Sequence, residues 1–234
     1  CHIPRPKEHR KGLVLLRVAL VDGDIAIRAG RRLMIDSQPN LLLVFEESQA
    51  QISLEKIPNL LVDVIVIDHR LKGFDGIELA RRLVDAYSEK GERCPTLVIT
   101  GTYATPELVI AAIRSGASDV VTQDAPMSEL LTAINNAGEA KKFADFSSLE
   151  AVLDQAEYRP SPDPLFVLRR SQLSDHLKAV LDRLDSGLSA EEIAKELRFS
   201  MVDFESQLSE LLVELHFATQ EQLYLALHDS RVGC

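Results

Sequence analysis

The sequence of 234 residues predicts an α/β domain with a five-stranded parallel sheet, followed by a small all-α domain. Two patterns carry this prediction. Between Arg17 and Ala137, a short apolar run and a segment of helical spacing alternate five times, which is typical of a parallel sheet with right-handed crossovers. From Leu173 onward the segments all have helical spacing. Three prolines between Tyr158 and Leu165 indicate an extended connection between the two parts.

The predicted strands are short, mainly apolar runs. The run Val64–Ile67 consists of four consecutive β-branched residues, a pattern typical of a strand buried on both faces. Asp68 follows this run, at the edge of the sheet where open α/β folds bind ligands. Since a lone buried charge is costly, a carboxylate here indicates a functional role. The strands are expected over Arg17–Val21, Leu41–Glu46, Val62–Ile67, Thr96–Ile99 and Val120–Thr122.

The segments between these strands predict helices. Gly76–Lys90 is the clearest, because its apolar residues recur every three or four positions. Pro58 ends the second helix, since proline cannot continue a helical hydrogen-bond ladder. The helices are expected from Asp24 to about Ile35, from about Ser48 to Pro58, and over Gly76–Lys90, Pro106–Ser115 and Met127–Ala137.

The second domain is predicted to contain four short helices. Two of them begin with capping-box spacings, Ser189 with Glu192 and Thr219 with Gln222. The helices are expected over Ser174–Ser186, Ser189–Leu197, Ser200–Glu214 and Thr219–Leu227. The predicted organisation is an N-terminal extension (1–16), the α/β domain (17–137), a linker (138–170) with a candidate helix at Phe143–Gln155, and the helical domain (171–234).

Composition excludes several classes of protein. A net charge of −10 argues against general attraction to nucleic acid. No apolar run approaches the roughly 18 residues of a membrane span, so no membrane partner is expected. The three cysteines, Cys1, Cys94 and Cys234, have neither a disulfide pattern nor metal-ligand spacing. A reduced, cytoplasmic location is therefore expected.

Several acidic and polar residues stand at the ends of the predicted strands. They are Val21-Asp22-Gly23-Asp24, Asp68, Asp75-Gly76, Thr100 and Gly116-Ala117. In these residues the first domain resembles the receiver domain of two-component response regulators. The resemblance implies a flavodoxin-like fold and a phosphorelay role without enzymatic activity of its own.

The segment Gly187–Leu197 resembles the scaffold part of the helix-turn-helix in LuxR/NarL-type regulators, and the next helix aligns with it without gaps. Together the two resemblances cover nearly all of the chain from Arg17. They imply signal-dependent regulation of transcription.

The receiver resemblance implies a phosphorylation pocket. Asp68 would be the phosphoacceptor and Thr100 the hydroxyl, while Asp22, Asp24 and Gln123 would complete the pocket. The resemblance also implies Mg²⁺, for which the candidate ligands are Asp22, Asp24, Asp68 and the backbone carbonyl of Arg70.

Three positions depart from the family's pattern. Gly23 replaces the second acid, which is normally a direct metal ligand, and Gln123 replaces the lysine. Val120 stands at the aromatic switch position. A neutral amide makes weaker hydrogen bonds to a phosphoryl group than a cation does. We therefore expect an atypical receiver, with weakened metal binding and phosphorylation.

The predicted recognition helix, Ser200–Glu214, is acidic. It contains four carboxylates and no Lys or Arg. Asp203, Glu205 and Gln207 stand where the family has its Thr-Val-Lys-x-His pattern. From Arg170 to the end, 6 Lys and Arg face 12 Asp and Glu, a balance of −6. Because phosphate contacts supply most nonspecific DNA affinity, this helix is expected to contact DNA poorly.

The last helix has apolar residues on more than one face. Leu223, Tyr224 and Leu227 are candidate dimer contacts, because the corresponding helix often pairs with its twin in the family. A role in the core of their own domain is the alternative. Three functions remain open: an atypical regulator acting as a homodimer, an adaptor that binds a protein partner instead of DNA, and a conventional phosphorylation-activated regulator.

Overall fold

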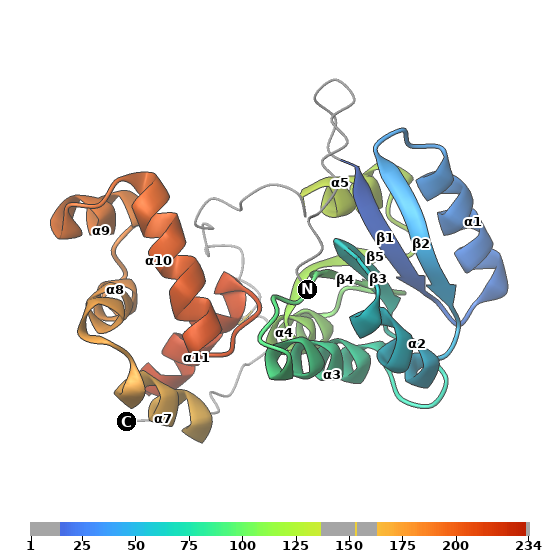
Figure 1. The fold of residues 1–234 in the computed structure, drawn as a ribbon. Coiled ribbons are helices and arrows are strands. Elements are labelled where there is room, and N and C mark those ends of the chain that lie inside the picture. The colour runs from blue at the N-terminus through green and yellow to red at the C-terminus, as the bar shows by residue number, and fades with distance from the viewer. Residues whose placement is uncertain (1–14, 137–152, 154–162, 233–234) are drawn as a thin grey trace.

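The computed structural model describes residues 15–136, 153 and 163–232. The first domain is a parallel five-stranded sheet with the strand order β2-β1-β3-β4-β5, which confirms the predicted α/β class (Figure 1). The strands are β1 Leu16–Val21, β2 Leu41–Glu47, β3 Val64–Asp68, β4 Thr96–Gly101 and β5 Ala117–Thr122.

Helices cover both faces of the sheet. One face packs against α1 (Ile25–Asp36) and α5 (Met127–Asn136). The other packs against α2 (Ala50–Lys56), the short 3₁₀ helix η1 (Ile57–Asn59), α3 (Gly76–Glu89) and α4 (Pro106–Arg114). Every residue of β3 is buried, as its β-branched composition predicts.

The strand order positions the candidate site. Because β1 lies between β2 and β3, the connections after β1 and β3 leave toward opposite faces of the sheet. Ligands of open α/β sheets bind at such a switch point, outside the carboxyl ends of the strands. Asp22 directly follows β1 and Asp68 ends β3.

The second domain is a helical bundle in which most buried apolar residues form one core. Its helices are α7 Pro164–Gln172, α8 Asp175–Asp185, α9 Ala190–Leu197, α10 Met201–Glu214 and α11 Gln220–Val232. Ser189 and Glu192 form the predicted capping box at the start of α9.

Several predicted boundaries differ from the structure, since α11 continues to Val232 and β3 runs from Val64 to Asp68. The end of the predicted linker, 138–170, contains α7, and Phe166 of α7 belongs to the helical core. Pro164 did not exclude this helix, because proline is well tolerated at the first helical position, where no hydrogen bond is needed from its nitrogen. Strand β5 begins at Ala117, three residues earlier than expected. The candidate helix Phe143–Gln155 lies outside the described residues except for Leu153, which is helical.

The two domains contact each other through α4 and α11. Ile110 of α4 and Leu225 of α11 belong to one small buried apolar cluster. The side-chain amide of Gln222 donates a hydrogen bond of 2.8 Å to the backbone carbonyl of Arg114. The Arg114 guanidinium pairs with Asp229 at 3.1 Å. Gln222 forms half of the capping box predicted with Thr219, because its backbone N–H donates to the Thr219 hydroxyl oxygen. Its side-chain Oε1 accepts from the backbone N–H of Ala218 instead of Thr219, and its Nε2 donates to the other domain.

Candidate functional site

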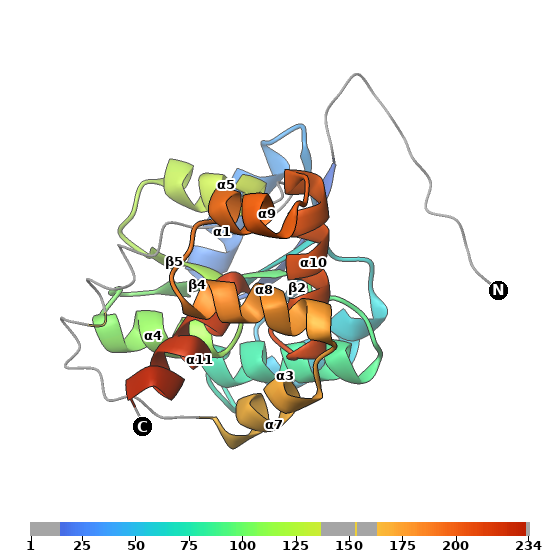
Figure 2. The same cartoon turned by 90° about the vertical axis from the view of Figure 1, so that its left-hand side faces the viewer.

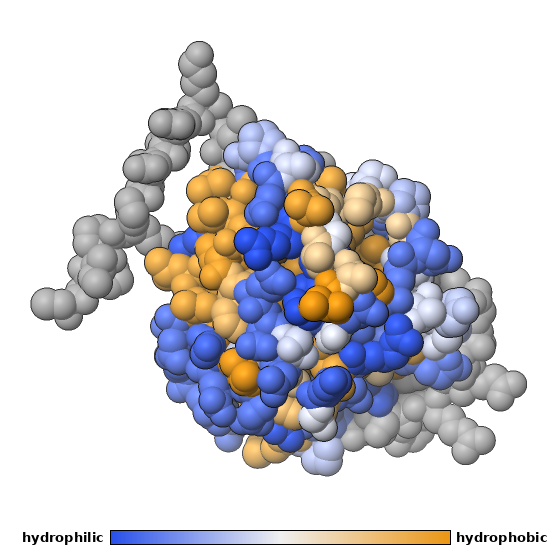
Figure 3. All heavy atoms as spheres, turned by 90° about the vertical axis from the view of Figure 1, so that its right-hand side faces the viewer, coloured by the Kyte–Doolittle hydropathy of each residue, from blue (hydrophilic) through white to orange (hydrophobic). Residues whose placement is uncertain are grey.

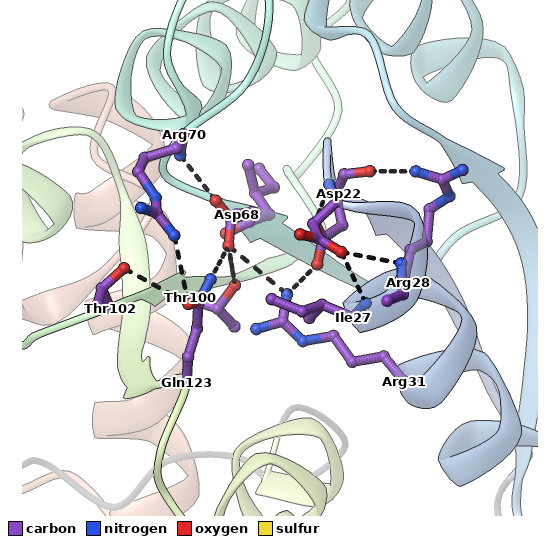
Figure 4. A network of polar contacts seen from close by, with 12 residues as sticks. Asp22, Ile27, Arg28, Arg31, Asp68, Arg70, Thr100, Thr102 and Gln123 are labelled. Carbon is purple, nitrogen blue, oxygen red and sulfur yellow. Dashed lines mark hydrogen bonds and ion pairs between the residues drawn. The ribbon is translucent and has the colours of Figure 1, made fainter.

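An open crevice of about 340 Å³ lies at the carboxyl ends of β1 and β3. It contains the predicted phosphorylation-pocket residues, with Thr100 buried beside it (Figure 4). The residues that line the crevice are Asp22, Gly23, Asp24, Asp68, Arg70 and Gln123.

Asp68 is 3% exposed, and protein groups already contact both of its carboxylate oxygens. Its Oδ1 accepts a hydrogen bond of 2.8 Å from the backbone N–H of Arg70. Its Oδ2 accepts one of 2.9 Å from the side-chain amide of Gln123 and lies 3.5 Å from the Thr100 hydroxyl. The neutral amide of Gln123 therefore contacts the carboxylate where the family's lysine is expected.

Asp22 forms a buried ion pair with Arg31, a residue outside the predicted pocket. Its Oδ2 lies 2.5 Å from Nη1 of Arg31, which reaches the site from α1 (Figure 4). The same Nη1 lies 3.8 Å from Oδ2 of Asp68. Burial raises the pKa of Asp22, while the backbone N–H of Asp24 and the guanidinium of Arg31 counteract this shift. Arg31 is thus the cation shared by the two buried carboxylates.

Asp24 acts as the cap of α1. Its Oδ1 accepts hydrogen bonds from the backbone N–H groups of Ala26 and Ile27, at 2.8 and 3.0 Å. These bonds lower the pKa of Asp24. Asp24 was predicted as a pocket residue and candidate metal ligand, but its carboxylate is used by the helix terminus.

The donor set does not fit Mg²⁺ in this arrangement. Asp22 pairs with Arg31, Asp24 caps a helix, and Gly23 has no side-chain ligand. Among the residues that the structure describes, no group of three or more His, Cys, Asp or Glu side chains is placed to hold a metal ion. Mg²⁺ needs one or two available carboxylates beside its waters. Here the guanidinium of Arg31 pairs with Asp22 and lies 3.8 Å from Asp68, so a positive charge already stands beside both carboxylates.

The family model for the response regulator receiver domain matches residues 18–135. The chain belongs to the response regulator family. This match and the relatives below confirm the predicted resemblance to regulators of the LuxR/NarL type.

The regulator is similar over most of its length to curated members of the family. It is 28% identical to the DNA-binding transcriptional activator DevR/DosR of Mycobacterium tuberculosis, over 89% of this chain and 92% of that protein. It is 25% identical to the nitrate/nitrite response regulator NarP of Escherichia coli, over 86% and 88%. The fold is similar to RcsB of Salmonella enterica serovar Typhimurium bound to the promoter rprA, with a TM-score of 0.51, 20% identity, and coverage of 92% and 99%.

The predicted recognition helix is α10, which packs beside α8 and α9 (Figure 2). Its C-terminal end lies next to the receiver domain, where His216, just after α10, contacts Ser88 of α3 at 3.1 Å. All four acidic side chains of α10 are exposed. Asp203 has a structural task, because it closes a capping box with Ser200, accepting bonds from its hydroxyl and its backbone N–H. Gln207 is partly buried. The exposed cations nearest in sequence are Lys195 of α9 and Arg198 in the turn.

Of the candidate dimer residues of α11, Leu223 and Leu227 are buried within this chain and Tyr224 is partly buried. Leu223 and Leu227 belong to the core of the helical domain, the alternative left open by the sequence. Tyr224 packs against the apolar cluster shared with α4. The structure therefore gives these side chains contacts within the monomer.

Arg31 was not predicted as a site residue, although its position in the sequence carries a signal. Arg31 precedes Met34 and Ile35 by three and four positions, which places it on the buried face of α1. An arginine on an apolar helix face needs a carboxylate partner within the fold. Asp22, nine residues earlier, is that partner.

Proposed function

We propose that this response regulator acts in the cytoplasm in signal transduction and transcriptional regulation, as an atypical and non-enzymatic member. Phosphorylation at Asp68 is reduced or absent, and DNA contacts use altered residues. The observation that carries the proposal is the state of Asp68, whose carboxylate bonds Gln123 and the Arg70 backbone while the acid at position 23 is missing.

Electrostatics support weak phosphorylation. A phosphoryl group on Asp68 would add negative charge beside Asp22 and Asp24. Hydrogen bonds from charged donors are roughly twice as strong as neutral ones, and Gln123 supplies a neutral donor. Arg70 lies at the rim, where its Nη2 is 3.3 Å from Oε1 of Gln123. The full chain incubated with acetyl phosphate and Mg²⁺ is therefore expected to keep its unmodified intact mass, and stoichiometric phosphorylation at Asp68 would refute this part of the proposal.

The similarity to DevR/DosR, a DNA-binding transcriptional activator, supports a role in transcription. The acidic surface of α10 argues against family-like major-groove contacts, because its carboxylates repel phosphates. Lys195 and Arg198 are the exposed cations available beside α10. DNA contacts through this edge of the domain would be few and weak.

A mobility shift with genomic DNA fragments tests this second part. We expect weak binding that is reduced further in a Lys195→Ala/Arg198→Ala variant, with Lys178→Ala on α8 as the control. The logarithm of the binding constant should fall by only about one to two units per tenfold increase in salt, as expected for a complex with two phosphate contacts. Tight binding that the double variant retains would indicate contacts through α10.

The alternative is an adaptor that acts through protein contacts or as a homodimer. It is favoured by exposed apolar residues, because such residues at a surface are suited to protein partners. Figure 3 shows the side of the receiver that carries α1 and β2, where apolar side chains gather beside hydrophilic ones. On these elements Ile25, Leu33 and Leu42 are exposed. Absence of any DNA shift, with a dimer in sedimentation, would favour this alternative.

A further inference from the structure

The guanidinium of Arg31 is a fixed cation inside the receiver pocket. The Arg31 side chain is 9% exposed and lies between two carboxylates that are themselves 1% and 4% exposed. Arginine cannot lose its proton in a protein, so this positive charge is permanent. Its Nη1 is 2.5 Å from Asp22 and 3.8 Å from Asp68.

Two carboxylates that share a buried site require a neighbouring positive charge if both are to be ionised. Neither Gln123 nor Gly23 contributes charge to this site. Arg70 is exposed, and its guanidinium bonds Gln123 instead of a carboxylate. Within the described residues, Arg31 is the buried cation that contacts Asp22 and Asp68.

We propose that Arg31 is an internal cation that takes the place of a divalent metal ion between Asp22 and Asp68, so that the receiver pocket is assembled without Mg²⁺. This inference rests on the proposed function as an atypical receiver. It adds to the altered phosphoacceptor site an altered source of positive charge. Arg31 belongs to α1, so the charge is covalently attached and independent of the metal concentration.

Arg31 and the missing acid at position 23 each weaken metal binding, and they do so separately. Gly23 removes a ligand, whereas Arg31 occupies an oxygen of Asp22 and places a like charge close to any incoming metal ion. Repairing the ligand alone should therefore not restore metal binding. Repairing both positions should restore it.

The experiment measures Mn²⁺ binding by electron paramagnetic resonance in the full chain and three variants. They are Gly23→Asp, Arg31→Met, and the two combined. Methionine keeps much of the volume of arginine without its charge. The wild type should leave Mn²⁺ free, and the combined variant should bind it at least about tenfold more tightly than Gly23→Asp alone, because a charge about 4 Å away is removed.

One control variant and one fallback comparison keep the outcome of the Mn²⁺ experiment clear. A Cβ at position 23 would lie 3.3 Å from the Arg70 carbonyl oxygen, so Gly23→Ala tests the effect of that contact alone. If Arg31→Met chains do not fold, wild type and Gly23→Asp decide: weak binding by both supports the proposal, and tight binding by either overturns it. Equal affinity of Gly23→Asp and the combined variant also overturns it. The readout is independent of phosphorylation and DNA binding, so a failure here leaves the proposed function standing.

Discussion

At the scale of single residues, Asp22 connects the receiver pocket to the packing of α1. Its Oδ1 accepts a hydrogen bond of 2.8 Å from the backbone N–H of Asp24, and its Oδ2 pairs with Arg31. The acid therefore fixes both the loop after β1 and the first half of the helix. Buried ion pairs of this kind become costly when one charge is removed, because the other charge remains buried.

We predict that Asp22→Asn lowers the free energy of unfolding by about 2–4 kcal/mol, since Arg31 would lose its closest partner. Urea denaturation followed by circular dichroism measures the change. Asp24→Asn is the matched control, because asparagine is as good a helix cap as aspartate and should change stability little. An Asp22→Asn variant as stable as the control would show that the ion pair does not matter for folding.

Glu78 gives the protein an acid-sensitive contact on α3. Hydrogen bonds from Arg81, and next from Arg82, lower the pKa of Glu78 to about 2. Because the folded-state pKa is depressed, the contribution to stability is present above the ordinary glutamate value and is lost as pH decreases toward 2. Acid titration of the denaturation midpoint should thus show a smaller decline below pH of about 4.5 in Glu78→Gln than in the wild type. An identical decline in both would contradict the prediction.

The sequence predicted the placement of Asp68 because a β-branched run followed by an acid identifies a strand end in a parallel sheet. It could not predict how that carboxylate is neutralised. The cation beside the two carboxylates is Arg31. It lies on a helix and reaches the strand ends only once α1 has packed on the sheet. Helical spacing places Arg31 on the buried face of α1, but which carboxylates it contacts depends on how α1 packs on the sheet.

At the scale of elements, α10 shows why an acidic residue cannot be assigned to a function from sequence alone. Asp203 occupies a position expected to contact DNA, but its carboxylate bonds the hydroxyl of Ser200 at 2.7 Å and its backbone N–H at 3.0 Å. These bonds lower the pKa of Asp203. The acid helps to begin the helix.

We predict that Ser200→Ala destabilises the helical domain by about 1 kcal/mol, because the hydroxyl no longer accepts the backbone N–H of Asp203. Thermal unfolding of the full chain measures it. Glu205→Ala, an exposed position on the same helix, serves as the control and should change stability by less than about 0.5 kcal/mol. Equal effects of the two substitutions would exclude a special role for the capping box.

The limits of element prediction are visible at α7. Three prolines indicated an extended linker, yet Pro164 begins a helix whose Phe166 is 1% exposed in the core of the helical domain. A proline favours an extended residue before it and tolerates a helix after it, so it identifies a boundary without saying which side is ordered.

At the scale of the whole molecule, α11 joins the two domains. Leu225 is 2% exposed, and it packs with Ile110 of α4 in a cluster separate from the helical-domain core. Tertiary contacts of this kind could not be predicted from the sequence, because the apolar residues of α11 are distributed over several faces.

We predict that Leu225→Asp separates the two domains without unfolding either, since it places a charge in the apolar contact with α4. Small-angle X-ray scattering should then give a larger radius of gyration than the wild type, with an unchanged circular dichroism spectrum. Val213→Asp, at a position 65% exposed on α10, is the control and should keep the wild-type dimensions. Unchanged dimensions for Leu225→Asp would refute the proposed role of this contact.

The central claim is that this response regulator has a receiver whose own residues occupy the phosphorylation pocket. It is tested most directly by intact mass after incubation with acetyl phosphate and Mg²⁺, comparing the wild type with the variant Gly23→Asp/Arg31→Met/Gln123→Lys. We expect an unmodified wild type and a variant that gains one phosphoryl group, which Asp68→Asn should abolish. Stoichiometric phosphorylation of the wild type at Asp68 would contradict the account.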